Sequence, residues 1–210
     1  MRIYDTLLAA YGPQHWWPGE SPFEVMVGAV LTQNAAWSNV ERAIDNLRRA
    51  EALAPEAILA LPREALAQLL RPSGYFNVKA GRLRTLCRWL QEAGGVEALC
   101  RWETRPLRHA LLAVKGVGPE TADDILLYAF ERPVFVIDAY TRRLLQRYGL
   151  AAGGEGYETL RHAFEAALGP DVALFNEYHA LLVHHAKVAC AVRPRCAGCC
   201  LARGCAAHLG

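Results

Sequence analysis

Residues 111–123 read LLAVKGVGPETAD, and two glycines, Gly116 and Gly118, stand at their centre with one residue between them. The apolar run before the glycines and the Pro-Glu-Thr segment after them predict two helices joined by a tight turn, because glycine takes backbone angles that other residues resist. The backbone N–H groups that open the second helix would form an anion site suited to a phosphate of a nucleic-acid backbone. A tight turn without a ligand is the alternative that these glycines alone leave open.

Helix signals dominate the rest of the chain. Ser21 and Ser38 each stand three residues before a glutamate, which is the pattern of a capping box. Apolar periodicity and glycine or proline breaks predict helices near residues 22–31, 38–47, 55–61, 63–70, 77–93, 105–113, 119–130, 139–148, 157–168 and 171–188. One β-like run, 133–137, has no partner strand in the sequence, so the predicted fold class is all-α.

The composition sets limits on function. The 210 residues carry a formal net charge of +2, with 53% hydrophobic and 21% charged residues. These values are ordinary for a globular enzyme, and the charge is too weakly basic to indicate a nucleic-acid partner by itself. No apolar run approaches the roughly 20 residues that span a bilayer. Because the first residues show no secretory signal, we expect a cytoplasmic protein.

Five of the seven cysteines crowd the end of the chain. Four of them are spaced as Cys190-x5-Cys196-x2-Cys199-x5-Cys205. An odd total and a terminal cluster without a secretory signal favour a metal site over disulfides. Ligation by thiolates alone at mixed short spacings suits a [4Fe–4S] cluster, whereas structural zinc more often uses two close Cys pairs. Zinc, no metal at all, and Cys200 as a substitute ligand stay open as alternatives.

With residues 136–143, VIDAYTRR, the glycine turn resembles the helix-hairpin-helix superfamily of base-excision DNA glycosylases, the relatives of endonuclease III. The family pattern is Gly-Val-Gly-x-x-Thr-Ala, followed further along the chain by an aspartate that opens a helix. Asp138 matches that aspartate, so the resemblance implies that it is the catalytic carboxylate. Such a group stabilises the oxocarbenium-like state of glycosidic hydrolysis or activates the attacking water. A plain helix N-cap is the alternative role for Asp138.

The same resemblance implies two helical lobes. One is a six-helix barrel-type domain at 22–133 with the helix-hairpin-helix at about 107–130; the other joins 1–21 to 134–210 and ends in an iron–sulfur cluster loop, 190–205. A damaged base flipped out of double-stranded DNA would enter the groove between the lobes. The implied DNA-contacting residues are Gln33 (filling the gap left by the base), Tyr75 (a wedge), Lys115, Gly116, Val117, Gly118 and Thr121. We expect the chain to act as a monomer.

Aromatic residues narrow the substrate class. The segments HWWP at 15–18, LTQNAAW at 31–37 and RPSGYFNVKA at 71–80 resemble the 3-methyladenine glycosylase subgroup. This likeness implies a base pocket formed by Trp16, Trp17, Trp37 and Lys187, a lysine that can be carbamylated in the subgroup. Indoles attract a cationic alkylated purine through cation–π interaction. Core packing of the tryptophans and an exposed helix position for the lysine are the alternatives.

One position departs from the bifunctional members of the family. Those members carry a lysine just before the Thr-Ala of the hairpin, and it attacks the sugar to form a Schiff base. This chain has Glu120 there, and a carboxylate cannot form an imine. We therefore predict a monofunctional glycosylase for an alkylated purine such as 3-methyladenine, with little or no AP-lyase activity. A glycosylase for uracil, a mismatched base or an oxidised pyrimidine, and a non-catalytic DNA-binding module, are the alternatives.

Overall fold

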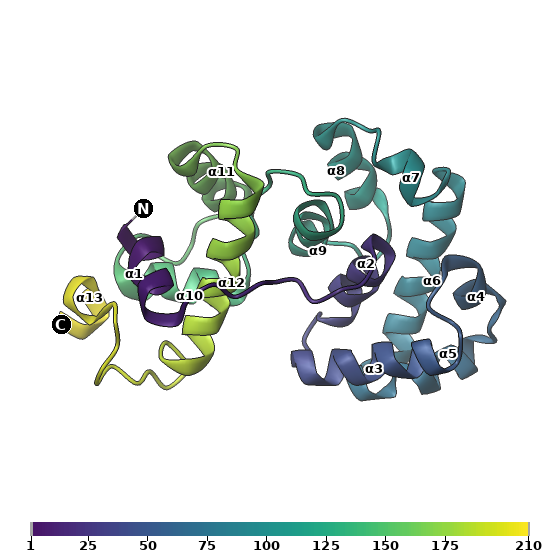
Figure 1. Cartoon of the computed structure of the whole chain (residues 1–210), viewed down its shortest axis with the longest axis horizontal. Helices are drawn as coiled ribbons and strands as arrows, with labels where there is room; N and C mark the ends of the chain where they lie inside the picture. The colour runs from purple at the N-terminus through teal and green to yellow at the C-terminus, as the bar shows by residue number, and fades with distance from the viewer. Residues whose placement is uncertain (1, 210) are drawn as a thin grey trace. The chain divides into compact units, whose positions relative to one another are not determined.

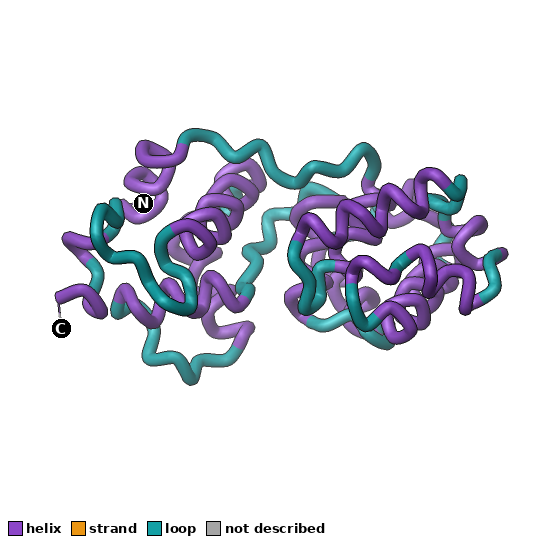
Figure 2. Tube along the Cα trace, turned by 90° about the horizontal axis from the view of Figure 1, so that it is seen from below, coloured by secondary structure: helices purple, strands orange, loops and turns teal. Residues whose placement is uncertain are grey.

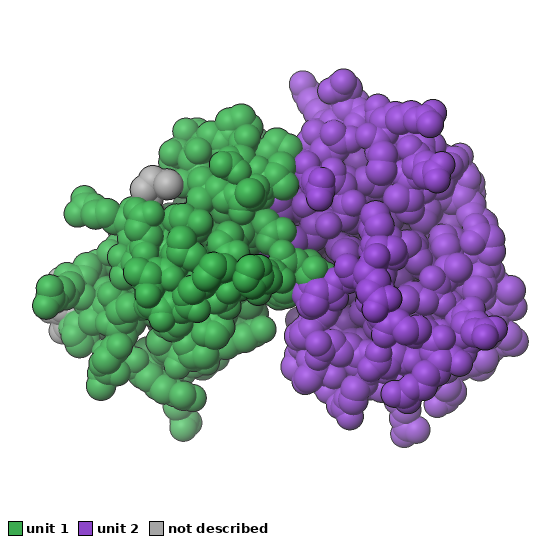
Figure 3. Space-filling view, in the orientation of Figure 1, with its two compact units in different colours: residues 1–17, 133–210 green, residues 18–132 purple. Residues whose placement is uncertain are grey.

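The computed structural model describes residues 2–209, and within that range it contains helices, turns and loops but no strand (Figures 1 and 2). The predicted all-α class is therefore confirmed. None of these helices is long and apolar enough to cross a membrane. The chain divides into two compact units: unit 1 comprises Met1–Trp17 with Pro133–Gly210, and unit 2 comprises Pro18–Arg132 (Figure 3). The division thus falls at Pro18 and Pro133, beside the boundaries at residues 22 and 134 expected from the sequence.

Unit 2 is built around a buried helix, α2. Its elements are α2 (Pro22–Leu31), α3 (Trp37–Arg49), α4 (Pro55–Ala60), α5 (Arg63–Leu69), η1 (Arg71–Ser73), α6 (Phe76–Glu92), α7 (Gly95–Leu99), α8 (Thr104–Ala113), α9 (Pro119–Asp124) and the π-helical turn η2 (Ile125–Ala129). Helix α2 is buried from Phe23 to Leu31 and packs against α3, α6, α9 and η2. A helix that is apolar on nearly every side has this position because each of its faces gains from leaving water.

Unit 1 is built around a long helix, α12. Its elements are α1 (Arg2–Tyr11), α10 (Ala139–Tyr148), α11 (Tyr157–Leu168), α12 (Val172–Val188), η3 (Ala202–Gly204) and α13 (Ala206–Leu209). Helix α12 packs against both α1 and α10. The segment Val134–Ile137, which had the β-like pattern, is buried and leads directly into α10. The first and last parts of the chain therefore fold together around α12.

The helix ends follow the sequence signals in part. At α2 the Ser21 hydroxyl accepts the N–H of Glu24 at 3.2 Å, as the capping box predicts. The second predicted box is wrong: α3 already begins at Trp37 and has Ala36 as its N-cap, so Ser38 lies inside the first turn and cannot cap it. The helix expected over 119–130 changes to π-helical geometry at Ile125. Helices α1 and α7 were not expected from the sequence.

Candidate active site, hairpin and cysteine loop

Asp138 is the N-cap of α10. Its backbone is extended, with φ −88° and ψ 178°, and Oδ1 accepts the N–H of Thr141 at 2.6 Å. This contact satisfies an amide that the start of the helix leaves without an intrahelical partner. The second oxygen, Oδ2, lies 3.7 Å from Nε2 of His179, which is on α12. One carboxylate oxygen is therefore fixed by its own helix and the other faces a neighbouring helix.

The environment of Asp138 favours its ionised form. The residue is 8% exposed. Burial raises the pKa of this carboxyl, but the contact with His179 and the amide of Thr141 outweigh burial, so the pKa of Asp138 lies below its usual range. Asp138 is thus a buried carboxylate that is charged at neutral pH. Groups held in this way are common at catalytic sites.

An aromatic stack extends from His179. The indole of Trp16 stacks on the His179 ring, with ring centroids 5.8 Å apart and an interplanar angle of 19°. The indole of Trp17 stacks on that of Trp16, with ring centroids 5.7 Å apart and an interplanar angle of 12°. Both indoles are partly exposed, whereas His179 is buried. The stack therefore leads from His179, which contacts Asp138, to the partly exposed indoles of Trp16 and Trp17.

Lys187 joins the same group of side chains from the end of α12. Its Nζ lies 5.8 Å from the ring centroids of both Trp16 and Tyr140, within the range of cation–π attraction. The Tyr140 ring also carries the guanidinium of Arg143 at 5.2 Å from its centroid. Lys187 is exposed, as its helix position alone suggests, and yet it is directed at two aromatic rings. Unit 1 thus brings together Asp138, Trp16, Trp17 and Lys187.

Trp37, the remaining residue of the predicted base pocket, belongs to unit 2. It is the first residue of α3 and is partly exposed. It lines a hollow of about 360 Å³ together with charged residues that include Glu24 and Arg48. The Glu24 carboxylate is nearly buried and pairs with Arg48 at 3.0 Å. Trp37 therefore lies beside charged side chains.

The hairpin turn requires glycine at one of its two positions. Gly116 has φ +97°, and a Cβ added there would lie 2.5 Å from Cγ of Arg82. Gly118 is the N-cap of α9, has extended backbone at φ −95°, and would have nothing within 4 Å of an added Cβ. The expectation that both glycines adopt angles closed to other residues is therefore wrong for Gly118. Pro119 follows it at the first helical position, as predicted.

Gln33 is anchored to this turn. Its Nε2 donates to the carbonyl of Gly116 at 3.1 Å and to the hydroxyl of Thr121 at 2.8 Å, and its Oε1 accepts from Arg82. Gly116 and Thr121, two of the implied DNA-contacting residues, thus hold the side chain of Gln33, a third. Of the others, Val117 is buried and Lys115 is exposed. The amide of Gln33 is oriented by bonds at both of its ends.

Tyr75 stands out from the surface of unit 2. It precedes α6 in a left-handed conformation, with φ +44°, and is 71% exposed. Four residues later, the buried Lys79 donates from Nζ to the carbonyls of Leu31 at 2.8 Å and Ser73 at 2.6 Å. Burial first, and the charge of Arg82 second, lower the pKa of Lys79 to about 8. Lys79 ties the end of α2 to the segment that presents Tyr75, a role that the sequence analysis missed.

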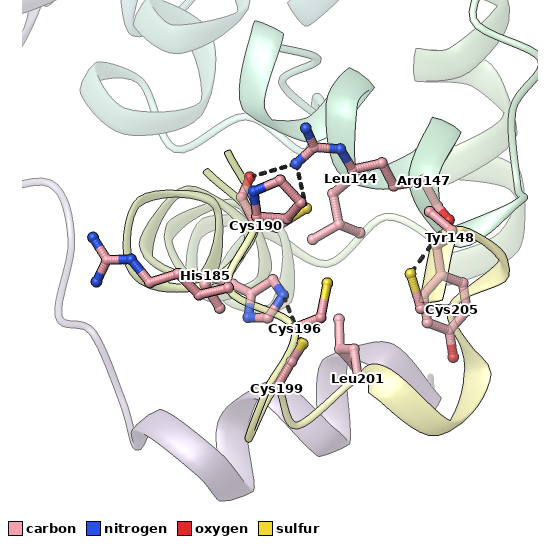
Figure 4. A pocket seen from close by; sticks show the side chains of 13 residues that line it. Leu144, Arg147, Tyr148, His185, Cys190, Cys196, Cys199, Leu201 and Cys205 are labelled. Carbon is pink, nitrogen blue, oxygen red and sulfur yellow. Dashed lines mark hydrogen bonds between the residues drawn. The ribbon is translucent and has the colours of Figure 1, made fainter. Parts of the chain in front are cut away.

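The four cysteines of the motif surround one cavity. The cavity has a volume of about 60 Å³. Figure 4 shows the side chains of Cys190, Cys196, Cys199 and Cys205 around it, with Leu144 and Leu201 among its apolar walls. Among residues 2–209, no three His, Cys, Asp or Glu side chains are close enough to share one metal ion. A multi-atom cluster spaces its ligands further apart than a single zinc ion does. Four thiols around an apolar cavity are compatible with the all-cysteine ligand set of an iron–sulfur cluster.

Cys200 points to different partners. Its Sγ donates to the hydroxyl of Tyr11 at 3.8 Å, and it does not line the cavity. The same hydroxyl lies 2.8 Å from Nδ1 of His185, whose Nε2 is 3.8 Å from Sγ of Cys199. The ring of His184 packs against that of Tyr11, with ring centroids 4.7 Å apart. This arrangement argues against Cys200 as a substitute ligand.

Helix α10 holds the cysteine loop through two arginines. Arg143 donates to the carbonyls of Cys190 at 2.8 Å and Ala186 at 3.1 Å. Arg147 donates to the carbonyls of Cys190 at 3.3 Å and Val192 at 2.9 Å, and to Sγ of Cys190 at 3.4 Å. Helix α10, whose N-cap is Asp138, is therefore hydrogen-bonded near its C-terminal end to the start of the cysteine loop.

Two contributors to these sites carry no specific sequence signal. His179 lies among apolar residues of α12 and has the pattern of a core histidine. Arg147 has the pattern of a basic residue in the last turn of a helix, which interacts favourably with the helix dipole. Their contacts join residues about 40 positions apart, and no local pattern records such a pairing.

Comparisons with known proteins place the chain in a family. The HhH-GPD superfamily of base excision DNA repair proteins matches residues 27–170. A protein of Methanocaldococcus jannaschii, named as an inferred DNA repair glycosylase, is 43% identical over 201 residues, which are 94% of this chain and 91% of that protein. Endonuclease III of Haemophilus influenzae is 30% identical over 179 residues, covering 85% of this chain and 81% of its own length.

Solved structures agree with this assignment. The 3-methyladenine DNA glycosylase MagIII of H. pylori, bound to 1,N6-ethenoadenine, has a TM-score of 0.76 and 31% identity over 89% of this chain and 96% of its own. A non-covalent endonuclease III–DNA complex has a TM-score of 0.85 at 21% identity, over 99% of this chain and 94% of its own, which shows the same fold. The family match spans most of the chain and includes the hairpin and Asp138. This chain belongs to the HhH-GPD superfamily of base excision DNA repair proteins and is a DNA glycosylase that acts on damaged DNA.

Proposed function

We propose that this glycosylase is monofunctional and hydrolyses the N-glycosidic bond of an alkylated purine such as 3-methyladenine, after the base has been flipped out of double-stranded DNA. The observation that carries the proposal is the group formed in unit 1 by Asp138, the Trp16–Trp17 stack and Lys187. It combines a charged carboxylate with aromatic faces. The similarity to MagIII, a 3-methyladenine DNA glycosylase, supports the substrate class.

Asp138 would act on the sugar. As the bond from C1′ to the base breaks, its electron pair leaves with the base and positive charge develops on the sugar, where the carboxylate of Asp138 stabilises it. Water then forms the new bond to C1′, and its proton passes to Asp138 and on to solvent. A base that is cationic through alkylation departs neutral. The leaving group therefore needs no proton from the protein.

The tryptophan pair would bind the base. Electron-rich indole faces attract the delocalised positive charge of an alkylated purine and discriminate against neutral bases. We also assign Trp37 of α3 to base binding, together with Trp16, Trp17 and Lys187. Lys187 as an ammonium would repel a cationic base, whereas its carbamate, formed from the neutral amine and CO₂ with release of a proton, would attract it.

The absence of lyase activity follows from the hairpin. Glu120 occupies the position at which bifunctional relatives carry the Schiff-base lysine, and it is exposed in the first turn of α9. The amine of Lys115 belongs to the other side of the turn. Because an imine needs an amine at the sugar, we expect the abasic strand to remain uncut until alkali is added.

A [4Fe–4S] cluster held by Cys190, Cys196, Cys199 and Cys205 is part of the proposal. When bound, it would supply a structural crosslink and take no part in the hydrolysis. The hydrogen bond from Arg147 to Sγ of Cys190 places a cationic donor on one of the sulfur atoms that would bind the cluster. The apolar walls of the cavity would shield the cluster from solvent.

Binding to DNA would involve the hairpin. We assign the amides of Gly116, Val117 and Gly118 to a phosphate, with Lys115 beside them as a cation. Gln33 would take the place of the flipped base in the duplex, and the exposed ring of Tyr75 would enter the opposite strand. The protein would act as a monomer.

The test of the substrate is a panel of duplexes. Free 3-methyladenine released from methylated DNA, with strands that break only after alkali, supports the proposal. Release of uracil, a mismatched base or an oxidised pyrimidine instead of an alkylated purine would favour the second candidate, a glycosylase for another lesion. That candidate has support from the identity to endonuclease III. The third possibility, a non-catalytic DNA-binding module, is set aside by the family membership.

A further inference from the structure

One buried side chain touches both parts of the candidate active site. His179, 3% exposed on α12, faces Oδ2 of Asp138 with its Nε2 at 3.7 Å and carries Trp16 on its ring face. The carboxylate belongs to the sugar chemistry and the indole to base binding in the function proposed above. An imidazole between them can fix the position of each.

We propose that His179 is a positioning residue for the glycosylase reaction, which orients Oδ2 of Asp138 through its Nε2 and sets the tilt of Trp16. The inference rests on the proposed catalytic role of Asp138. It assigns to α12 a part in the chemistry that neither the sequence motifs nor the family match provides. His179 would touch neither the sugar nor the base itself.

The geometry of Asp138 calls for such a partner. Oδ1 is held at 2.6 Å by the amide of Thr141, which fixes that end of the carboxylate within its own helix. Oδ2 would otherwise be a buried anionic oxygen turned toward α12, and a buried charge without a partner is costly. The contact with His179 offsets this cost while leaving a longer, more adaptable distance than a tight hydrogen bond. Oδ2 is thereby kept charged and available to the sugar.

Other polar groups near Asp138 on α10, α11 and α12 have partners elsewhere. From α10 itself, Thr141 supplies an amide, and Arg143 is directed at the Tyr140 ring. From α11, the hydroxyl of Tyr157 accepts the N–H of Ile137 at 3.4 Å. From the end of α12, Lys187 is also directed at the rings of Trp16 and Tyr140. His179 thus supplies an ionisable contact to this carboxylate, at 3.7 Å from Oδ2.

The two functions of His179 can be separated by substitution. His179→Phe keeps a flat ring under Trp16 and removes the N–H that faces Oδ2. His179→Gln keeps a donor and removes the ring. His162→Gln is the matched control, since His162 is an exposed histidine on α11. Each variant is compared with wild type in single-turnover release of the base from a duplex over pH 5 to 9, roughly the range in which such acid–base groups titrate.

His179→Phe should shift the acid limb of the pH profile. Activity requires ionised Asp138, so it falls as pH drops through the pKa of that carboxyl. Without His179, burial dominates and raises this pKa, so an acid limb enters the range above pH 5, in which wild type shows none. The rate of His179→Phe at pH 5 should therefore be about tenfold below that of wild type and should recover as the pH rises. The affinity for duplex DNA should change by less than about twofold.

His179→Gln should keep the acid limb of the wild type and weaken binding of the damaged base instead. His162→Gln should match wild type in both respects. A folded His179→Phe protein whose limb does not move, or whose rate falls equally at every pH, overturns the inference. If that variant does not fold, a His179→Gln protein with a displaced limb overturns it as well. The proposed function fails separately, through an Asp138→Asn variant that is as active as wild type.

Discussion

The carboxylate of Asp138 serves a helix and, in our proposal, a reaction. Oδ1 caps α10 through the amide of Thr141, and Oδ2 faces His179. Asparagine is also a good N-cap and can accept the same N–H, but it carries no charge. The two roles can therefore be measured independently.

Capping should separate two substitutions of Asp138. Asp138→Asn should keep the stability of wild type within a few tenths of a kcal/mol, whereas Asp138→Ala should lose about 1 kcal/mol because the amide of Thr141 loses its acceptor. Both should lose base release. Urea denaturation of the three proteins provides the measurement. Equal stabilities of the two variants would show that the cap contributes nothing.

The hairpin glycines should respond very differently to alanine. Gly116→Ala needs a positive φ and places Cβ 2.5 Å from Cγ of Arg82, so it should destabilise unit 2 by about 1–3 kcal/mol and weaken DNA binding. Gly118→Ala is the matched control, because Gly118 has extended backbone and nothing lies within 4 Å of an added Cβ. This variant should lose little stability. Denaturation and duplex binding by both variants test this. Similar losses at the two positions would contradict the geometry.

At the scale of elements, Lys79 makes the stability of unit 2 depend on pH. Its folded pKa of about 8 lies below the usual value of 10.5. Between these values the unfolded chain binds the proton and the folded one does not, so this residue makes stability rise as pH increases from 8 to 10.5. Lys79→Met should lack that rise. The difference in unfolding free energy between the two proteins, followed over this pH range, gives the test, and a difference that stays constant would refute it.

Helix α10 and the cysteine loop should be coupled through Arg147. Arg147→Met removes donors to Cys190 and Val192, so the loop should loosen and a bound cluster should be lost several times faster. Arg142→Met is the control on the same helix, because Arg142 donates to the carbonyl of Glu155 instead. Iron content and visible absorption during exposure to air report the loss. Equal rates in the two variants would mean that Arg147 does not hold the loop.

Local patterns predicted some elements well and others poorly. The capping box at Ser21 and the turn at Gly116 are determined by neighbouring residues, and the structure contains both. The start of α3 was misplaced because Ser38 has capping chemistry but already lies in the helix. The π-helical turn after α9 was missed, since an apolar run continues through it without a break.

At the scale of the whole molecule, the chemistry of unit 1 depends on residues far apart in sequence. Trp16 comes from the first part of the chain, Asp138 from its second half, and His179 from α12. The motif around Asp138 could be identified from sequence because its residues are adjacent. The contact of Asp138 with His179, and that of His179 with Trp16, arise only when α12 packs between the two ends. Such pairings leave no periodic signal.

The division into units also separates two kinds of function. Unit 2 contains the hairpin, Gln33 and Tyr75, which our proposal assigns to the DNA backbone and to the duplex. Unit 1 contains Asp138, the tryptophan pair and the cysteine loop. Substitutions in unit 2 should therefore change mainly binding, and those near Asp138 should change mainly the rate of base release.

The central claim is that Asp138 carries the hydrolysis, and the most direct measurement is single-turnover release of 3-methyladenine from methylated duplex DNA by wild type and Asp138→Asn. Because the variant keeps its N-cap, a folded protein with wild-type affinity for DNA is expected. We predict free base from wild type and a rate at least about 100-fold lower for the variant. Release by Asp138→Asn at the wild-type rate would contradict the account and place the catalytic group elsewhere.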